Sequence, residues 1–482
     1  MFNMKLHKKQ INQIISLLLF LAISINPFDL FSLPQNQIFA IAITVFVSCL
    51  WITEAVALPV ASLLLLVVIP LTGVMPLKDA AESFAHPIIF LFMGGFMLGL
   101  TFEKWQFHKR IALLIVSIVG VSPRKLILSF MVSTCFISMW ISNTASTIIM
   151  LPIASSIISL LAQVTGNDSK EIRKFSVALL ISIAFSATVG GNGTLIGSPP
   201  NALLAGFLLD LYDIDLSFLN WMLIGIPFMV LSFIACYFGI IVVFRFENLN
   251  VEPAQKYTHD EIKGLGKLTQ PEIYIIIVSA IAILLLVSRG WINNLFNTDV
   301  LSDTLIMISA ALSFFILPVK HEKHKYVLQW SDTKDLSWGV LYLFGGALCL
   351  ANMLQKTGII ELLGNSVMGF SSLPPILVLG LLLIIILLIT EIIGGTAICS
   401  VFTPTTLAIA TSLNIDLLYL AVPVTLAANV AYLTPVATAP NAIIFSKGNM
   451  RIIDMVKAGI AIKIVSFILL QFFVTWWIKL IF

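Results

Sequence analysis

The sequence predicts an all-α polytopic membrane protein with two inverted-topology repeats, re-entrant hairpins and broken transmembrane helices. The first observation is composition: 59% of the 482 residues are hydrophobic and 11% are charged, whereas a soluble domain carries roughly 25% charged residues. The second is a polar, helix-breaking motif that occurs twice inside apolar sequence. The third is a glycine pair at corresponding places in the two halves.

Long apolar runs account for most of the chain. A membrane-spanning helix needs about 20 apolar residues, and runs of about this length or longer recur from one end to the other. A polar segment at 245–271 separates two hydrophobic halves and predicts an interfacial connector. We expect membrane helices within 12–33, 36–53, 55–75, 126–163, 174–210, 219–244, 272–288, 301–318, 376–412, 416–436 and 454–478.

Two further apolar segments carry glycine pairs at their centres. Gly94-Gly95 lies within 82–103, and Gly345-Gly346 lies within 337–356. We predict re-entrant hairpins here, which enter and leave the membrane on one side. The alternative is that both segments are ordinary spans whose glycines allow close packing.

The duplicated polar motif is the strongest functional signal. The first copy is Ser142-Asn143-Thr144 with Gly197-Ser198-Pro199-Pro200-Asn201. The second is Gly394-Gly395-Thr396 with Ala437-Thr438-Ala439-Pro440-Asn441. The triplets and the glycine pairs repeat with almost the same separation, which indicates an internal duplication. Duplicated broken helices are typical of secondary transporters, whose substrates and coupling ions bind where the repeats meet.

The chemistry of the motifs fits ion binding. A broken helix in hydrocarbon requires protein or water to satisfy its freed backbone groups. The spacing of Ser138, Ser142 and Asn143 lets their side-chain oxygens converge, and oxygens are the ligands that Na⁺ needs. Exposed amides at helix N-termini favour anions, and exposed carbonyls favour cations. Neither motif contains Lys or Arg, so a bound anion would be held by dipoles, hydroxyls and a cotransported cation.

Other classes of function find little support. The five cysteines lie in apolar sequence without a CxxC pair, which argues against a disulfide framework or a zinc site. The net charge of +3 gives no support for nucleic-acid binding. No nucleophile, metal-ligand set or carboxylate pair converges by spacing, so we expect no enzyme. A cation/proton antiporter predicts ionisable ligands at the helix crossing, and neither motif contains Asp.

Charged residues give a first view of the topology. Lys5, Lys8 and Lys9 precede the first apolar run, which by the positive-inside rule predicts a cytoplasmic N-terminus. The short loops and the lack of a transit peptide favour a bacterial inner membrane. Glu54 and Glu391 lie at membrane depth, and we predict structural roles for both, as helix caps or hydrogen-bond acceptors.

Six motifs together carry a resemblance to a known family: Thr53-Glu54-Ala55 with Pro59, Gly94-Gly95, Ser142-Asn143-Thr144, Gly190 to Asn201, Thr390-Glu391, and Leu433 to Asn441. Over nearly its whole length the chain resembles the divalent anion sodium symporter (DASS) family of di- and tricarboxylate and sulfate transporters. The resemblance implies a homodimer in the lipid bilayer, in which a mobile transport domain slides along a scaffold domain in elevator fashion.

The same resemblance divides the chain into five parts. Scaffold helices occupy 1–81, and the first transport-domain repeat occupies 82–210, with a hairpin, a broken helix at 142–144 and a loop at 190–201. Residues 211–336 form scaffold helices and the interfacial connector. The second repeat occupies 337–445, with a hairpin, a broken helix at 394–396 and a loop at 433–441, and 446–482 form a C-terminal transmembrane helix.

The resemblance also assigns binding residues. The first sodium site would comprise Ser138, Ser142, Asn143 and Gly197, and the second Thr390, Ile393, Gly395 and Ala437. The substrate would be bound by Asn143, Thr144, Ser198, Pro199, Gly394, Gly395, Thr396, Thr438 and Ala439. The chain departs from the family at Gly394-Gly395, which replaces Ser-Asn and removes two side-chain oxygens.

These features together predict a secondary transporter of small divalent organic anions. C4-dicarboxylates such as succinate, malate and fumarate are the expected substrates, and sodium-coupled symport is the expected mechanism. Sodium-independent dicarboxylate exchange is an alternative, because the second triplet lacks coordinating oxygens. Sulfate-type transport is another, because the proline-containing loops do not reveal the size of the anion.

Overall fold

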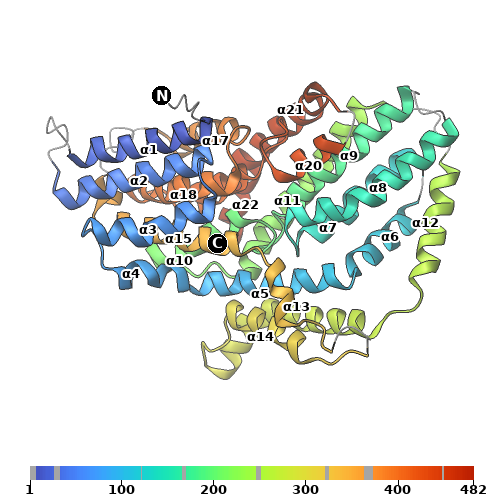
Figure 1. The fold of residues 1–482 in the computed structure, drawn as a ribbon, viewed down its shortest axis with the longest axis horizontal. Coiled ribbons are helices and arrows are strands. Elements are labelled where there is room, and N and C mark those ends of the chain that lie inside the picture. The colour runs from blue at the N-terminus through green and yellow to red at the C-terminus, as the bar shows by residue number, and fades with distance from the viewer. Residues whose placement is uncertain are drawn as a thin grey trace, which may run out of the picture.

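The computed structural model describes residues 7–25, 33–120, 122–165, 170–245, 251–320, 325–362, 373–447 and 450–482. Most of these residues are helical. In Figure 1 one group of helices, including α1, α2 and α3, lies on the left, and another, including α7 and α8, lies on the right. The C-terminal end lies between the two groups.

The helices follow one another with short connections. In the first half they are α1 (Lys8–Ile25), α2 (Gln35–Thr53), α3 (Leu58–Leu71), α4 (Leu77–Glu82), α5 (Pro87–Lys104), α6 (Phe107–Val119), α7 (Pro123–Ser138), α8 (Asn143–Thr165), α9 (Lys170–Gly190), α10 (Pro199–Tyr212), α11 (Phe218–Val243) and α12 (Glu252–Leu265). In the second half they are α13 (Gln270–Phe296), α14 (Asp303–Ile316), α15 (Trp338–Lys356), α17 (Pro375–Ile389), α18 (Gly395–Ser412), α19 (Leu417–Ala428), α20 (Ala439–Lys447), α21 (Ile452–Ile468) and α22 (Thr475–Ile481).

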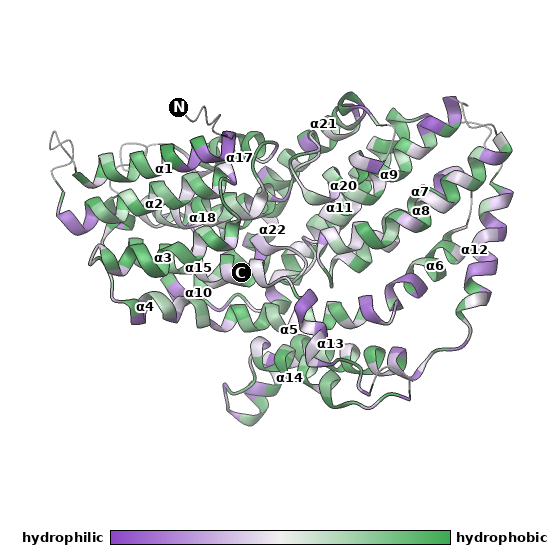
Figure 2. Ribbon diagram, viewed as in Figure 1, coloured by the Kyte–Doolittle hydropathy of each residue, from purple (hydrophilic) through white to green (hydrophobic). Residues whose placement is uncertain are grey.

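The helices have the composition of a membrane protein. Among the described residues, nine helices are long and apolar enough to cross a bilayer. Figure 2 shows hydrophobic residues along most helices, whereas hydrophilic residues are concentrated on α12 at the right-hand edge. Because α12 lies within the polar segment that separates the two halves of the sequence, it fits the interfacial connector expected there.

The two halves pack in a reciprocal way. Helix α5 of the first half packs against α14 of the second, and α15 of the second packs against α3 of the first. Helix α10 packs against α18 and α19, and α20 packs against α8 and α9. Each half therefore inserts a short helix between two helices of the other half, as repeats related by a two-fold axis would do.

The glycine-pair segments are not re-entrant hairpins, contrary to the prediction. Helices α5 and α15 run without interruption through Gly94-Gly95 and Gly345-Gly346. A Cβ on Gly94 would lie 2.8 Å from the backbone of Met307, and a Cβ on Gly346 would lie 2.4 Å from the Ser62 side chain. The glycines therefore allow helices to approach closely, because a helix keeps its backbone hydrogen bonds at glycine, and the packing alternative is correct.

The hairpins lie at the two triplets instead. Helices α7 and α8 are joined by residues 139–142, and α17 and α18 by residues 390–394. Helix α9 packs against both α7 and α8, and α19 against both α17 and α18. The segments predicted as broken helices at 142–144 and 394–396 are thus hairpin tips. The broken helices are α9–α10 and α19–α20, where residues 191–198 and 429–438 interrupt the helical path.

Candidate functional site

The residues assigned to the substrate share one kind of position, the N-terminus of a helix. Asn143 and Thr144 begin α8, and Gly394 to Thr396 begin α18. Ser198 and Pro199 begin α10, while Thr438 and Ala439 begin α20. All the assigned substrate residues therefore lie in or next to the first turn of one of four helices, where unpaired N–H groups create a positive partial charge.

Two of the residues assigned to sodium lie at the opposite kind of helix end, whereas Ser142, Asn143 and Gly395 lie at helix starts. Ser138 is the last residue of α7, and Thr390 is the C-cap of α17. Gly197 and Ala437 lie in the two helix breaks, and Ile393 lies in the second hairpin tip. Free carbonyl oxygens at such positions attract cations.

Oxygen atoms converge around Asn143 in the first half. Ser138 Oγ lies 2.7 Å from the Asn143 side-chain amide and 2.7 Å from the carbonyl oxygen of Ala187. The same terminal atom of Asn143 lies 2.9 Å from the Ala187 carbonyl oxygen and 3.3 Å from that of Gly197. With its nitrogen turned inward, the amide donates to these three oxygens. With its oxygen turned inward, four oxygens face one another, which is a donor set for a hard cation.

Ser142, which is assigned to the same sodium site, makes a hydrogen bond to the backbone of α8. Its Oγ accepts a hydrogen bond from the Ala145 N–H at 3.2 Å, so it caps the start of α8. Serine is a favoured residue at this position because its oxygen satisfies one of the free N–H groups. The structure thus brings Ser138, Asn143 and Gly197 together, and it gives Ser142 a helix-capping contact.

The corresponding place in the second half is built differently. A Cβ on Gly395 would lie 2.2 Å from the carbonyl oxygen of Ala428, so the start of α18 lies directly against the end of α19. Thr390 Oγ1 donates to the carbonyls of Leu387 and Val430, at 3.0 and 3.3 Å. Glycine takes the position of Asn143 here, and the Thr390 hydroxyl donates only to backbone carbonyl oxygens among the described residues.

Glu391 has the structural role that was predicted for it. Its buried carboxylate accepts hydrogen bonds from the backbone N–H groups of Tyr432, Leu433 and Thr434, at 2.9 to 3.1 Å. It also forms an ion pair with Lys463 of α21. The helix break after α19 is therefore held by one carboxylate. Glu54 follows α2 as its C-cap in the left-handed region, with φ of 46°, which fits the expected capping role.

Ser198 belongs to a buried amide cluster that links the two breaks. Its Oγ donates to Asn429 Oδ1 at 2.8 Å. The Asn429 amide donates to Asn192 Oδ1 at 2.8 Å and to Asn201 Oδ1 at 3.2 Å. No role was predicted for Asn429 from the sequence, because this residue lies outside the repeated motifs. A lone asparagine between apolar residues was nevertheless a signal of a buried polar contact.

The remaining assigned residues make few hydrogen bonds through their side chains. Thr438 Oγ1 accepts from the Asn441 N–H at 3.3 Å, and so caps α20. Among the hydrogen bonds of the described residues, none joins Thr144, Thr396, Thr438 or Ala439 to one another. Ala437 is buried in the second break, where only its backbone carbonyl could bind an ion.

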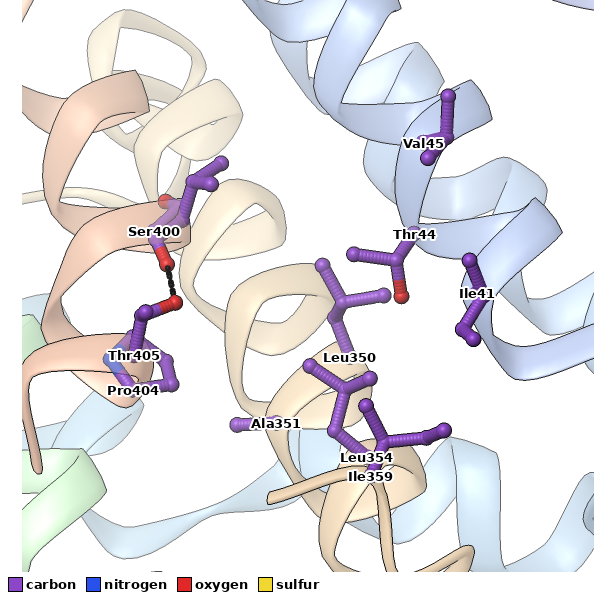
Figure 3. A pocket seen from close by; sticks show the side chains of 11 residues that line it. Ile41, Thr44, Val45, Leu350, Ala351, Leu354, Ile359, Ser400, Pro404 and Thr405 are labelled. Carbon is purple, nitrogen blue, oxygen red and sulfur yellow. Dashed lines mark hydrogen bonds between the residues drawn. The ribbon is translucent and has the colours of Figure 1, made fainter. Parts of the chain in front are cut away.

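A pocket elsewhere in the molecule does not suit an anion. It lies between α2, α15 and α18, and Ile41, Leu350, Leu354 and Pro404 are among its apolar lining residues (Figure 3). Thr44, Ser400 and Thr405 supply its few polar atoms, and no charged residue lines it. The pocket lies beside α18 but does not include the hairpin tip.

The fold and these broken helices define a secondary transporter of the membrane. The family model described as the sodium:sulfate symporter transmembrane region matches residues 7–482. The chain therefore belongs to this family, the divalent anion sodium symporters.

Individual relatives agree with this family. The chain is 34% identical over 444 residues to "sodium-dependent dicarboxylate transporter SdcS" of Staphylococcus saprophyticus, covering 91% of this chain and 86% of that protein. It is also 34% identical to the protein of the same name from Staphylococcus aureus USA300, over 91% of this chain and 85% of that protein. Among solved structures, the Alcanivorax borkumensis YdaH transporter has a similar fold, with a TM-score of 0.52 and 12% identity over 83% of this chain and 87% of that one.

Proposed function

We propose that the protein is a sodium-coupled transporter of small divalent organic anions, with C4-dicarboxylates such as succinate as the substrate class. The observation that carries this proposal is the placement of every assigned substrate residue at the start of α8, α10, α18 or α20. Helix N-termini bind carboxylates without a basic side chain, and neither polar motif contains Lys or Arg. The names of the similar staphylococcal proteins support the same substrate class.

Asn143 provides the coupling between ion and anion. When Na⁺ lies beside Ser138, Asn143 and Gly197, the amide oxygen of Asn143 turns toward it, and the NH₂ group then turns away from the oxygen cluster. That NH₂ group becomes available to donate to a substrate carboxylate next to Thr144. Without the ion, the NH₂ group donates to the carbonyls of Ala187 and Gly197 instead. Sodium therefore binds first and completes the anion site.

The family supports a proposal for the oligomeric state of the protein and for the motion of its domains. The protein forms a homodimer, and the hairpins and broken helices make up a transport domain that moves in elevator fashion against scaffold helices such as α2. The mostly apolar pocket between α2, α15 and α18 in Figure 3 suits a sliding boundary, since no charged residue lines it. The protein resides in a bacterial inner membrane with its N-terminus in the cytoplasm.

The test is uptake of labelled succinate into proteoliposomes under an inward Na⁺ gradient, with a K⁺ gradient as control. Uptake that requires Na⁺ and needs no internal succinate is the expected result. Uptake that requires internal succinate and ignores Na⁺ would establish exchange and overturn the symport proposal. Competition by sulfate at concentrations near those of succinate would instead indicate the sulfate-type alternative.

A further inference from the structure

The two helix breaks are braced by corresponding residues of α11 and α21. A Cβ on Gly225 of α11 would lie 2.3 Å from the carbonyl oxygen of Asn192, in the first break. A Cβ on Gly459 of α21 would lie 2.5 Å from the carbonyl oxygen of Tyr432, in the second. Asn192 and Tyr432 hold the same position in their breaks, since each lies nine residues before the asparagine of its motif. The two glycines are therefore equivalent.

One helical turn beyond each glycine, the two halves differ in charge. In the first half that position is Met229, and a Cβ on Gly193 would lie 2.8 Å from its sulfur and 3.2 Å from the Met139 methyl group. In the second half the position is Lys463, which pairs with Glu391. Met139 and Glu391 also correspond, since each follows directly after Ser138 or Thr390. Two methionines next to Gly193 in the first half therefore hold the positions that an ion pair holds in the second half.

The ammonium group of Lys463 lies at the second cation site. Its Nζ is 3.4 Å from Thr390 Oγ1, and Thr390 is a residue assigned to that site. The Lys463 and Glu391 side chains are only 10% and 9% exposed. The carboxylate of Glu391 would attract a cation to this place, and the lysine already supplies one. A sodium ion here would face the repulsion of a like charge in a medium of low dielectric constant.

The second triplet also disfavours a bound cation in the second half. Gly394-Gly395 lacks the side-chain oxygens that would coordinate an ion, and a side chain on Gly395 would collide with the Ala428 carbonyl. The loss of donors and the presence of an ammonium group are separate observations. Both disfavour a mobile cation in the second half, while the oxygen cluster around Asn143 remains in the first.

We propose that the ammonium group of Lys463 replaces a sodium ion in the second half of the site, so that Na⁺ binds only at Ser138, Asn143 and Gly197. This inference rests on the proposed sodium-coupled function. It makes Lys463 the residue that sets the coupling ratio, because it neutralises Glu391 with a charge that is never released. One Na⁺ then accompanies each divalent anion.

The experiment measures the sodium dependence of succinate uptake in proteoliposomes of the full-length protein. We expect a hyperbolic dependence, with a Hill coefficient of about one for a single ion site. The paired fluxes of radioactive sodium and labelled succinate should give a ratio near one. Sodium-dependent uptake with a ratio of two or more would overturn this inference alone, whereas uptake that ignores Na⁺ would overturn the proposed function.

Variants of Lys463 test the role of its charge. In Lys463→Met the Glu391 carboxylate is left without its cation, so a second Na⁺ should bind and the Hill coefficient should rise clearly above one. Lys463→Arg keeps the charge and should keep the wild-type ratio. The matched control is Lys457→Met, because Lys457 lies on the same helix and is exposed.

The double variant Glu391→Gln/Lys463→Met removes both charges. It distinguishes an effect of the unpaired carboxylate from a loss of folded protein. It should return the Hill coefficient to about one, because no carboxylate remains to attract a second ion. If both the single and the double variant lower the amount of folded protein or the maximal rate without changing the sodium dependence, Lys463 has only a structural role and the inference fails.

Discussion

Asn201 and Asn441 make the same two hydrogen bonds in the two halves of the molecule. The Asn201 amide donates to the carbonyls of Gly191 and Thr194, at 2.9 and 2.8 Å, and the Asn441 amide donates to those of Ala431 and Thr434, both at 3.1 Å. In each case the acceptors lie ten and seven residues earlier in the chain. Each asparagine thus fixes the break that precedes its own helix.

The hydrogen bonds of Asn201 and Asn441 to the helix breaks should be required for the stability of the fold. Replacing either residue with alanine leaves two buried carbonyl groups without this donor, and an unsatisfied buried group costs about 1–3 kcal/mol. We expect a lower thermal unfolding midpoint for Asn441→Ala and a still lower one for Asn201→Ala, because Asn201 Oδ1 also accepts from Asn429. The measurement is the unfolding midpoint in detergent, with the exposed Asn294→Ala as control. Equal unfolding midpoints for all three variants would contradict this stabilising role of Asn201 and Asn441.

The sequence was sufficient to predict the internal repeat and the loops at 190–201 and 433–441, but the broken helices were expected at 142–144 and 394–396. Pro199-Pro200 and Asn201 mark a helix start by their own backbone chemistry, and the second motif repeats the proline and the asparagine. The hairpins were misplaced because a glycine pair can signal either a turn or a close helix contact. Only the neighbours, such as Met307 beside Gly94, distinguish the two.

Other features could not be predicted without the fold, because they join residues that lie far apart in the sequence. Lys463 lies 72 residues after Glu391 and outside every repeated motif. Asn429 lies 231 residues after Ser198, its hydrogen-bond partner. No local pattern links such pairs, so they become visible only when α19 and α21 are packed against the rest of the molecule.

The two glycines of the second triplet should respond differently to substitution. Nothing lies within 4 Å of a Cβ on Gly394, whereas a Cβ on Gly395 would lie 2.2 Å from the Ala428 carbonyl oxygen. Gly394→Ser should therefore fold normally, and its hydroxyl can cap α18. Gly395→Asn should lower the unfolding midpoint, since overpacking typically costs about 1–3 kcal/mol. A stable Gly395→Asn protein with wild-type transport would show that α18 and α19 can separate at no cost.

Removing the amide of Asn143 should uncouple transport. Asn143→Ala eliminates one oxygen of the cation cluster and the proposed donor to the substrate carboxylate, so both the sodium dependence and succinate binding should be lost. We expect uptake to fall at least about tenfold, equivalent to 1.4 kcal/mol or more. The measurement is succinate uptake over a range of Na⁺ concentrations, with Ser159→Ala on the exposed side of α8 as control. Normal sodium dependence in Asn143→Ala would refute the assignment of the first site.

The contact between Ser198 and Asn429 should couple the two halves energetically. Ser198 belongs to the first break and Asn429 to the second, and their 2.8 Å hydrogen bond is buried. In a double-mutant cycle, Ser198→Ala and Asn429→Ala should together destabilise the protein less than the sum of the two single changes, with a coupling energy of about 0.5–3 kcal/mol. Ser198→Ala combined with Asn441→Ala provides the comparison, because these residues share no hydrogen bond and their effects should add.

A coupled Ser198–Asn429 pair would also connect the helix starts of opposite repeats that we propose to bind the anion. Because Asn429 directly follows the Ala428 carbonyl that contacts Gly395, a shift of the first break would be transmitted to the start of α18. Asn429→Ala should therefore weaken succinate binding even though Asn429 was not assigned to the substrate. The apparent affinity for succinate at saturating Na⁺ measures this effect, and an unchanged affinity together with additive stabilities would show that the two breaks behave independently.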